Sequence, residues 1–150
     1  MKIASIVDDL VLSQSSFYMI KNFNILGQDL NNQPFCFFHN LSSVPVPPLF
    51  SIMNAYYASY FYGGVLLATN LKTLKTVVNL SSNAKKYFYV NDLEWLREEK
   101  DFMDNVSMMN NPKIKLIARS ESHAKAIKNY CNVSPVAIIE NWNYKELLKL

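Results

Sequence analysis

Glycine is rare in this chain, with three glycines among 150 residues, at positions 27, 63 and 64. Glycine-rich phosphate loops need several closely spaced glycines, because a β-carbon would keep the backbone away from the phosphate. A dinucleotide-binding fingerprint and a P-loop are therefore both excluded. Residues 8–16, which follow the first apolar run, contain no glycine, so we expect no pyrophosphate to approach the backbone there. We predict no cofactor.

Cysteine and histidine are also rare, with two of each. Cys36 and Cys131 are far apart and form no CxxC pattern, which predicts buried free thiols in a reducing compartment. His39 and His123 belong to no HxxxH or HExxH pattern and have no acidic partner at ligand spacing. The sequence therefore predicts no metal site.

Charged residues make up 18% of the chain, and the formal net charge is +3. This mild excess permits anionic ligands, but nucleic-acid-binding domains concentrate more basic charge on one face. No signal-peptide pattern opens the sequence, because Asp8 and Asp9 interrupt its first apolar run. We therefore expect a cytoplasmic protein without strong nucleic-acid binding.

No charged residue lies between Asn40 and Leu71, and residues 49–68 are long enough to cross a bilayer. Asn54, a glycine pair, four tyrosines and three upstream prolines argue against a span. A buried helix, a Gly-Gly turn and a buried strand explain the stretch better. Contact of this stretch with a membrane surface stays open.

Six short runs rich in apolar, β-branched and aromatic residues lie along the chain. Each run is nearly continuous rather than alternating, which is typical of strands covered on both faces in a parallel sheet. Successive runs begin roughly 20 to 30 residues apart, the length of one strand and one crossover helix. The predicted strands are residues 3–7, 34–38, 65–68, 87–90, 114–118 and 136–139.

The segments between these runs have helix-start residues followed by amphipathic or apolar patterns. The first predicted helix has Ser13, Ser15 and Ser16 as possible N-caps and ends near Gly27. The other predicted helices span 48–62 and 71–80, begin at Asn91 or Asp92, begin at Ser120, and span 144–150. Alternating strands and helices predict a single Rossmann-like domain over residues 1–150. Its fold class is α/β, doubly wound, with a mostly parallel six-stranded sheet and helices on both faces. Right-handed crossovers favour the strand order 3-2-1-4-5-6.

Polar residues follow each predicted strand, and ligands of open α/β sheets bind at these carboxyl ends. In the predicted order, Asp8 and Asp9 line the same crevice as Asn91 and Asp92. Carboxylates and amides suit the vicinal hydroxyls of a sugar, and a desolvated carboxylate can act as a general base. The candidate catalytic residues are Asp8, Asp9 and Asp92. The candidate ligand-binding residues are Asp8, Asp9, His39, Asn91, Asp92, Ser120 and Glu121. Helix capping and turn formation explain the same residue types and remain open for each.

Residues 115–143, KLIARSESHAKAIKNYCNVSPVAIIENWN, resemble a segment of the GT-B retaining glycosyltransferases. In that family a strand enters a helix that starts with Ser-Glu, and a later apolar strand ends in Asn. The run YFYVNDLEW, residues 87–95, looks like the family's aromatic strand with its acidic or amide turn. The opening KIASIVDDL matches the family's first strand in position. Members of the GT-B family have two Rossmann-like domains. The N-terminal domain holds the acceptor, and the C-terminal domain holds the sugar nucleotide.

The resemblance implies an acceptor side made by Asp8 and Asp9, the Asn91-Asp92 turn, and Ser120-Glu121. The chain departs from the family in having no glycine in its first loop and Asn141-Trp142-Asn143 in place of an Asn-Gly turn.

Three hypotheses for function follow from this comparison. In the first, the chain is an acceptor-recognition half-domain, which acts with a separate donor-binding chain or as a fragment of a longer enzyme and is inactive alone. In the second, it is a non-catalytic binding or regulatory protein that kept the fold. In the third, it is a small enzyme of another kind. The expected partners are a carbohydrate or glycan acceptor, together with a donor-domain protein or a second copy in a homodimer.

Overall fold

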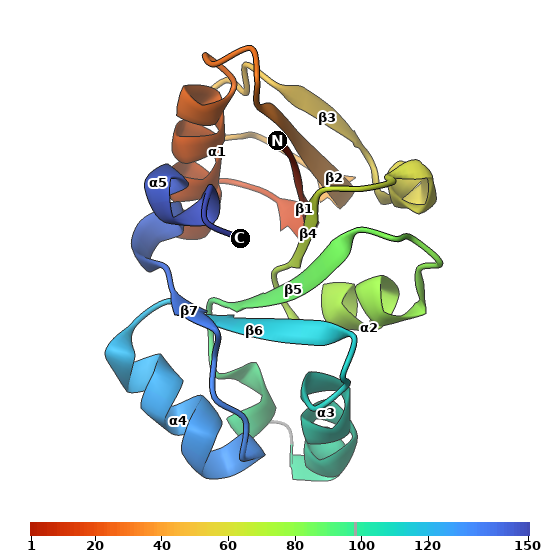
Figure 1. Ribbon diagram of the computed structural model, residues 1–150, viewed down its shortest axis with the longest axis vertical. Helices are drawn as coiled ribbons and strands as arrows, with labels where there is room; N and C mark the ends of the chain where they lie inside the picture. The colour runs from red at the N-terminus through yellow and green to blue at the C-terminus, as the bar shows by residue number, and fades with distance from the viewer. Residues whose placement is uncertain (98) are drawn as a thin grey trace.

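The computed structural model describes residues 1–97 and 99–150, which form an α/β fold around one sheet (Figure 1). All strand pairs of this sheet are parallel, and the strand order is β3-β2-β1-β4-β5-β6-β7. The prediction of a Rossmann-like α/β domain is confirmed, with seven strands rather than six. The strands are β1 (Lys2–Leu10), β2 (Gln33–Leu41), β3 (Ser51–Asn54), β4 (Val65–Ala68), β5 (Lys85–Val90), β6 (Ile114–Ala118) and β7 (Ala137–Ile138).

Several helices begin at the residues that the sequence predicts, because polar side chains cap their free N–H groups. Ser13 accepts from the N–H of Ser16, and Asn70 forms a capping box with Thr73. The α-helices are α1 (Gln14–Leu26), α2 (Leu71–Asn79), α3 (Phe102–Met109), α4 (Glu121–Cys131) and α5 (Tyr144–Leu147). Short 3-10 helices are η1 (Ala55–Tyr60), η2 (Glu94–Leu96), η3 (Glu99–Asp101) and η4 (Glu140–Trp142).

Helices cover both faces of the sheet, so the central strands are buried on both sides (Figure 1). Side chains of α1 and α5 pack on one face, where Phe23 and Leu147 are fully buried. Side chains of α2, α3, α4 and η1 pack on the other face around Leu74, Phe88 and Ile127. This division of helices between two faces is the doubly wound arrangement expected for right-handed crossovers.

The predicted helix over residues 48–62 is wrong. The segment instead forms the edge strand β3 and then η1, which begins where the Asn54 side chain accepts from the N–H of Tyr56. Upstream prolines remove backbone donors, and β-branched and aromatic residues are weak helix formers. The segment therefore pairs with β2, through Phe35↔Ser51, rather than coiling into an α-helix.

The predicted strand order is also corrected. Residues 65–68 pair directly with β1, through Ile3↔Val65, instead of lying outside β2. The unpredicted strand β3 takes that outer position. The strand over residues 87–90 is consequently separated from β1 by β4.

The helix predicted to begin at Asn91 or Asp92 is absent at that point. Leu93 has a non-helical backbone, and the described chain passes through η2 and η3 before α3 begins at Phe102. Residue 98, which falls inside the predicted helix, lies outside the described residues. Among the helices formed by residues 1–97 and 99–150, none has the length and apolar character that a membrane crossing requires.

Candidate functional site

The strand order reverses between β1 and β4, which defines the switch point of the sheet. From the carboxyl end of β1 the chain enters α1 on one face. From the carboxyl end of β4 it enters α2 on the other. The connections therefore diverge, and a depression opens between them where ligands of open α/β sheets bind.

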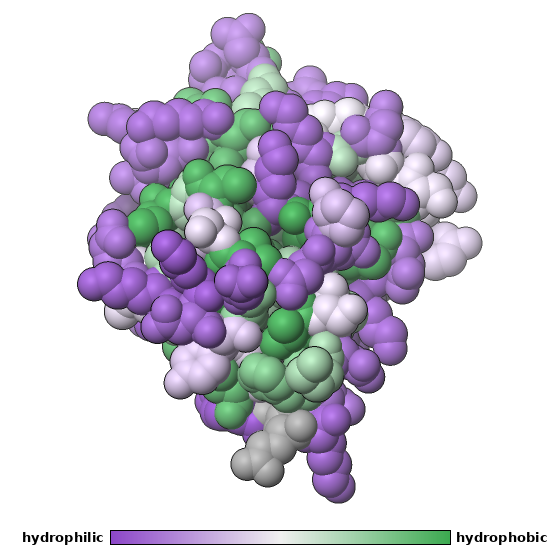
Figure 2. Space-filling view, turned by 60° about the horizontal axis from the view of Figure 1, so that its bottom comes forward, coloured by the Kyte–Doolittle hydropathy of each residue, from purple (hydrophilic) through white to green (hydrophobic). Residues whose placement is uncertain are grey.

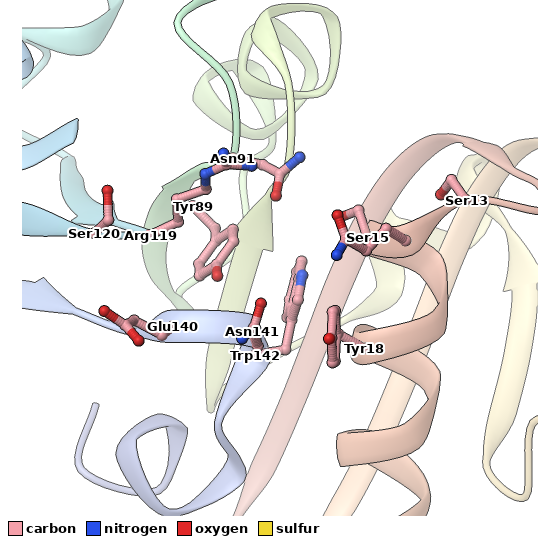
Figure 3. A pocket seen from close by; sticks show the side chains of 11 residues that line it. Ser13, Ser15, Tyr18, Tyr89, Asn91, Arg119, Ser120, Glu140, Asn141 and Trp142 are labelled. Atoms are coloured by element: carbon pink, nitrogen blue, oxygen red, sulfur yellow. The ribbon is translucent and has the colours of Figure 1, made fainter. Parts of the chain in front are cut away.

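The larger cavity at this edge has a volume of about 550 Å³ and is called the cleft below (Figure 3). Figure 3 shows α1 residues on one side and Arg119 and Ser120 on the other, with the segment after β7 between them. The residues that line the cleft are Ser13, Gln14, Ser15, Tyr18, Tyr89, Asn91, Arg119, Ser120, Glu140, Asn141 and Trp142.

A second cavity, of about 250 Å³, adjoins the cleft and is called the acidic recess. The two cavities share Ser13, Ser15, Asn91 and Trp142. The recess also contains four carboxylates, from Asp8, Asp9, Asp92 and Glu94, with Thr69 and Asn70 between them at the end of β4. The two cavities together place an acidic surface beside an aromatic one.

The aromatic surface consists of a stacked pair. The ring centroids of Tyr89 and Trp142 are 4.4 Å apart at an interplanar angle of 28°. Phe23 of α1 meets the Trp142 ring edge-on at 6.0 Å. The Tyr89 hydroxyl donates to the Ile139 carbonyl at 2.7 Å, and burial raises the pKa of Tyr89 to about 12. The phenol therefore stays neutral and tied to the backbone.

Trp142 reaches this position through an unusual turn. Asn141 has φ 48° and Trp142 has φ 58°, both in the left-handed region. This conformation costs about 1 kcal/mol or more for a residue with a β-carbon. The Asn22 side chain of α1 donates to the Asn141 carbonyl at 3.0 Å, and aromatic packing holds Trp142. Strained residues of this kind cluster at functional sites.

The indole N–H of Trp142 is buried and has no hydrogen-bond partner within residues 1–97 and 99–150. Leaving a buried donor unpaired costs about 1 to 3 kcal/mol. Trp142 lines both the cleft and the acidic recess, and in Figure 3 its ring stands between Tyr89 and Tyr18. Among the same residues, the indole N–H of Trp95 in the opposite core is likewise buried without a partner.

Each acidic group at the end of β1 has a partner of its own. Asp8 pairs with Lys72 of α2 at 2.7 Å, and this hydrogen bond raises the pKa of Lys72. Asp9 accepts from the Asn40 side chain of β2 at 2.8 Å. Both aspartates lie inside β1 rather than after it, because the strand continues to Leu10.

Asp92 is also paired, since it accepts from the guanidinium of Arg97 and from the N–H of Leu93. Ser120 is the N-cap of α4, and its hydroxyl lies 2.9 Å from Nδ1 of His123. Burial, together with the nearby Arg119, lowers the pKa of His123. The histidine is therefore mainly neutral near pH 7.

The structure brings most of the predicted site residues together. Asp8, Asp9, Asn91 and Asp92 line the acidic recess, although β4 separates the two strands that carry them. Ser120 lines the adjoining cleft. Two predicted residues line neither cavity: His39 lies within β2, and Glu121 is exposed in the first turn of α4.

Sequence reasoning missed the aromatic residues of the site. Tyr89 belongs to an apolar run and is indistinguishable there from a core residue. Position 142 could have been singled out from the sequence, because Trp142 stands where the GT-B family has a glycine. Arg119 and Glu140 directly follow the predicted strands 114–118 and 136–139 but are not among the predicted site residues.

Metal-ligating residue types are scattered over the described part of the chain. Across residues 1–97 and 99–150, no three histidine, cysteine, aspartate or glutamate residues group closely enough to hold a metal ion. Cys36 and Cys131 are both free and buried, and burial raises the thiol pKa values to about 12 and about 11. Both thiols are poor nucleophiles at neutral pH.

The arrangement suits recognition of a small ligand with several hydroxyl groups. It offers aromatic side chains along the cleft and a rim of carboxylate, amide and guanidinium groups. Searches against protein-family models, curated proteins and solved structures found no match to this chain.

Proposed function

We propose that the chain binds a carbohydrate in the cleft and serves as the acceptor-binding side of a glycosyl-transfer system. The observation that carries the proposal is the position of Trp142. A strained turn holds its indole against Tyr89 and leaves its buried N–H unpaired beside the cavity. Such backbone strain is unfavourable in a site without a ligand. The unpaired indole N–H is shared with Trp95, so the strained turn is what distinguishes Trp142.

Aromatic side chains in the cleft support a sugar because one face of a sugar ring carries mainly C–H groups, which pack on aromatic rings. Tyr18, on the α1 side of the cleft, is half-buried and is the most exposed of its three aromatic residues (Figure 3). Tyr89 and Trp142 also line the cleft but are each 1% exposed.

The polar rim supports the same ligand. Arg119 provides only donors, Glu140 only acceptors and Asn91 both, and all three line the cleft. Neighbouring hydroxyls on a sugar both donate and accept, so a mixed rim can bind them in pairs. The cleft volume of about 550 Å³ lies within the range of small-ligand sites.

The acceptor role in this proposal rests on the resemblance to the GT-B glycosyltransferases. In that family the N-terminal Rossmann-like domain holds the acceptor, and a second domain holds the sugar nucleotide. We assign the donor side to a protein region outside these 150 residues. Accordingly, the chain should bind saccharides and should not bind a sugar nucleotide by itself.

The two tryptophans allow a direct test by NMR. Trp95 is buried in the opposite core, lines neither cavity and serves as the internal reference. The ¹⁵N-labelled protein is titrated with a panel of neutral mono- and disaccharides, and the two indole N–H signals are followed. We expect the Trp142 signal to shift and the Trp95 signal to stay in place.

Two matched variants complete the test. Trp142→Phe keeps an aromatic ring but removes the N–H, and should weaken saccharide binding about tenfold or more. Trp95→Phe should leave binding unchanged. Failure of every saccharide to move the Trp142 signal would reject the site, and binding of UDP-glucose by the chain alone would reject the acceptor assignment.

A second function, binding without catalysis, is favoured by one observation. Asp8, Asp9 and Asp92 all have protein partners, so none of these candidate general bases is free. The two proposals are distinguished by measuring glycosyl transfer with a donor-domain protein, using wild-type chain and an Asp8→Asn variant that binds saccharides normally. Transfer by the wild type that is lost in Asp8→Asn supports glycosyl transfer. No transfer by the wild type supports binding alone.

A further inference from the structure

A third cavity lies on the β2–β3 side of the molecule and shares no lining residue with the cleft or the acidic recess. Its volume is about 460 Å³, and it is called the tyrosine groove. It is lined by Lys2, Phe35, Phe37, Met53, Tyr57, Tyr60, Phe61 and Tyr62. Six of these eight residues are aromatic.

In residues 1–97 and 99–150, the cover of β2 and β3 on this face is the short helix η1 rather than an α-helix, which leaves room for the groove. η1 packs through Ala55 and Ala58. Phe61, just after η1, fixes the floor by meeting Phe35 and Phe37 edge-on at 5.7 and 6.0 Å. The floor is therefore preformed.

The tyrosines around the groove face solvent. Tyr57, Tyr60 and Tyr62 are 52%, 66% and 59% exposed. Figure 2 shows pale surface of intermediate hydropathy at the right edge of the view, on the side where η1 lies in Figure 1. Large exposed aromatic side chains around a concavity are typical of binding sites.

The charge of the groove has one sign. Lys2 is the only charged residue that lines it in the described chain. The other wall residues come from segments 35–37 and 53–62, which contain no aspartate or glutamate. An aromatic cavity that recognises a cation would gain from an acidic neighbour and would be opposed by this lysine.

We propose that the tyrosine groove binds a single-chain amphiphile with an anionic head group, its apolar chain on the aromatic floor and its head near Lys2. The volume fits a small apolar ligand, and the single cation selects the sign of the head group. This site is independent of the carbohydrate proposal, since the two share no residue.

The test uses decanoate and decyltrimethylammonium, which have the same chain length and opposite charge, below their critical micelle concentrations. The chain has six methionines, and Met53 is the only one in the groove. In a ¹³C-methyl-methionine spectrum, decanoate should shift the Met53 signal and leave unchanged that of Met19, a buried residue of α1. Decyltrimethylammonium should bind several-fold more weakly.

Two exposed substitutions separate the charge from the aromatic surface. Lys2→Gln should weaken decanoate binding about fivefold and leave decyltrimethylammonium binding no weaker. Tyr57→Ser should weaken both about tenfold. The matched controls on α4, Lys125→Gln and Tyr130→Ser, remove an exposed cation and an exposed tyrosine elsewhere and should have no effect.

Several results would overturn the proposal. One is the absence of a Met53 shift with decanoate, and another is equal affinity for the two amphiphiles. Equal effects of Tyr57→Ser and Tyr130→Ser would also reject it. Binding to phosphatidylglycerol vesicles without binding to monomeric decanoate would identify a membrane surface as the partner instead.

Discussion

Asn141 and Trp142 show how single residues depart from their ordinary preferences to form the site. Asn tolerates the left-handed region through its short polar side chain, but Trp has no such preference. Trp142 is 1% exposed, and its contacts with Tyr89 and Phe23 stabilise the strained backbone. The turn and the stack are therefore coupled.

The strain at Asn141 predicts the outcome of a pair of substitutions. Asn141→Ala should be less stable than Asn141→Gly by about 1 kcal/mol, because the left-handed conformation is strained for alanine and not for glycine. Urea denaturation of the two variants measures the difference. Asn132, which ends α4 at φ 56°, should show a similar difference. Equal stability of the two Asn141 variants would show that the turn is not left-handed in solution.

Cys36 predicts a pH dependence of stability. Burial raises the pKa of its thiol from 9.0 to about 12, so the unfolded chain loses the proton first. Between pH 9 and pH 12 the folded state binds more protons, and the free energy of unfolding falls by about 1.4 kcal/mol per pH unit from this group. Below pH 9 the thiol is protonated in both the folded and the unfolded state, so it adds no pH dependence to the free energy of unfolding.

The slope is measured by urea denaturation from pH 8 to pH 10.5. Cys36→Ala should reduce the fall above pH 9, while the remaining slope reports other groups such as Tyr89, whose raised pKa acts in the same direction. An identical slope in wild type and Cys36→Ala would contradict the burial of the thiol.

Among the structural elements, the turn that enters β4 depends on two glycines with different constraints. Gly63 and Gly64 both have positive φ, at 71° and 72°. A β-carbon on Gly64 would overlap the carbonyl oxygen of Lys2, whereas a β-carbon on Gly63 would meet nothing within 4 Å. Only the second glycine is needed for close approach to β1.

Gly63→Ala should therefore cost about 1 kcal/mol, from backbone conformation alone. Gly64→Ala should cost about 1 to 3 kcal/mol more, because the strand β1 must shift to make room. Thermal or urea unfolding of both variants checks the order. Equal losses would mean that the Gly64–Lys2 contact relaxes without cost.

Over the whole molecule, stability should fall from the centre of the sheet to its edges. β4 lies between β1 and β5 and is buried throughout, whereas β3 pairs only with β2 and is partly exposed. Amide hydrogen exchange should be slowest in β4 and much faster in β3. Comparable protection of the two strands, measured by mass spectrometry, would contradict this gradient.

The fold was largely predictable because its strands are local, continuous apolar runs. The runs at residues 65–68 and 114–118 coincide with β4 and β6, and Asn70 marks the start of α2. The edge strand β3 escaped prediction because its four residues lie in a long uncharged stretch with no clear period. Because β3 was not predicted, the strand over residues 65–68 was wrongly placed outside β2.

The site was predictable in its polar part only. Parallel topology alone brings Asp8 and Asp92 to one edge of the sheet, so their proximity survived the error in strand order. The stacking of Tyr89 on Trp142 depends on ring orientations and on a left-handed turn. Neither is encoded in a local pattern, since residues of the same types also fill ordinary cores.

The interior position of β1, between β2 and β4, also bears on how the protein is made. During synthesis β1 emerges before both of its neighbours, and Ile3 pairs with Pro34 on one side and Val65 on the other. About thirty more residues must be synthesised before β1 can pair with β2, and about sixty before it can pair with β4. Until then its backbone N–H and C=O groups are free to pair with other chains. Chaperone binding to nascent chains should be strongest before β4 leaves the ribosome.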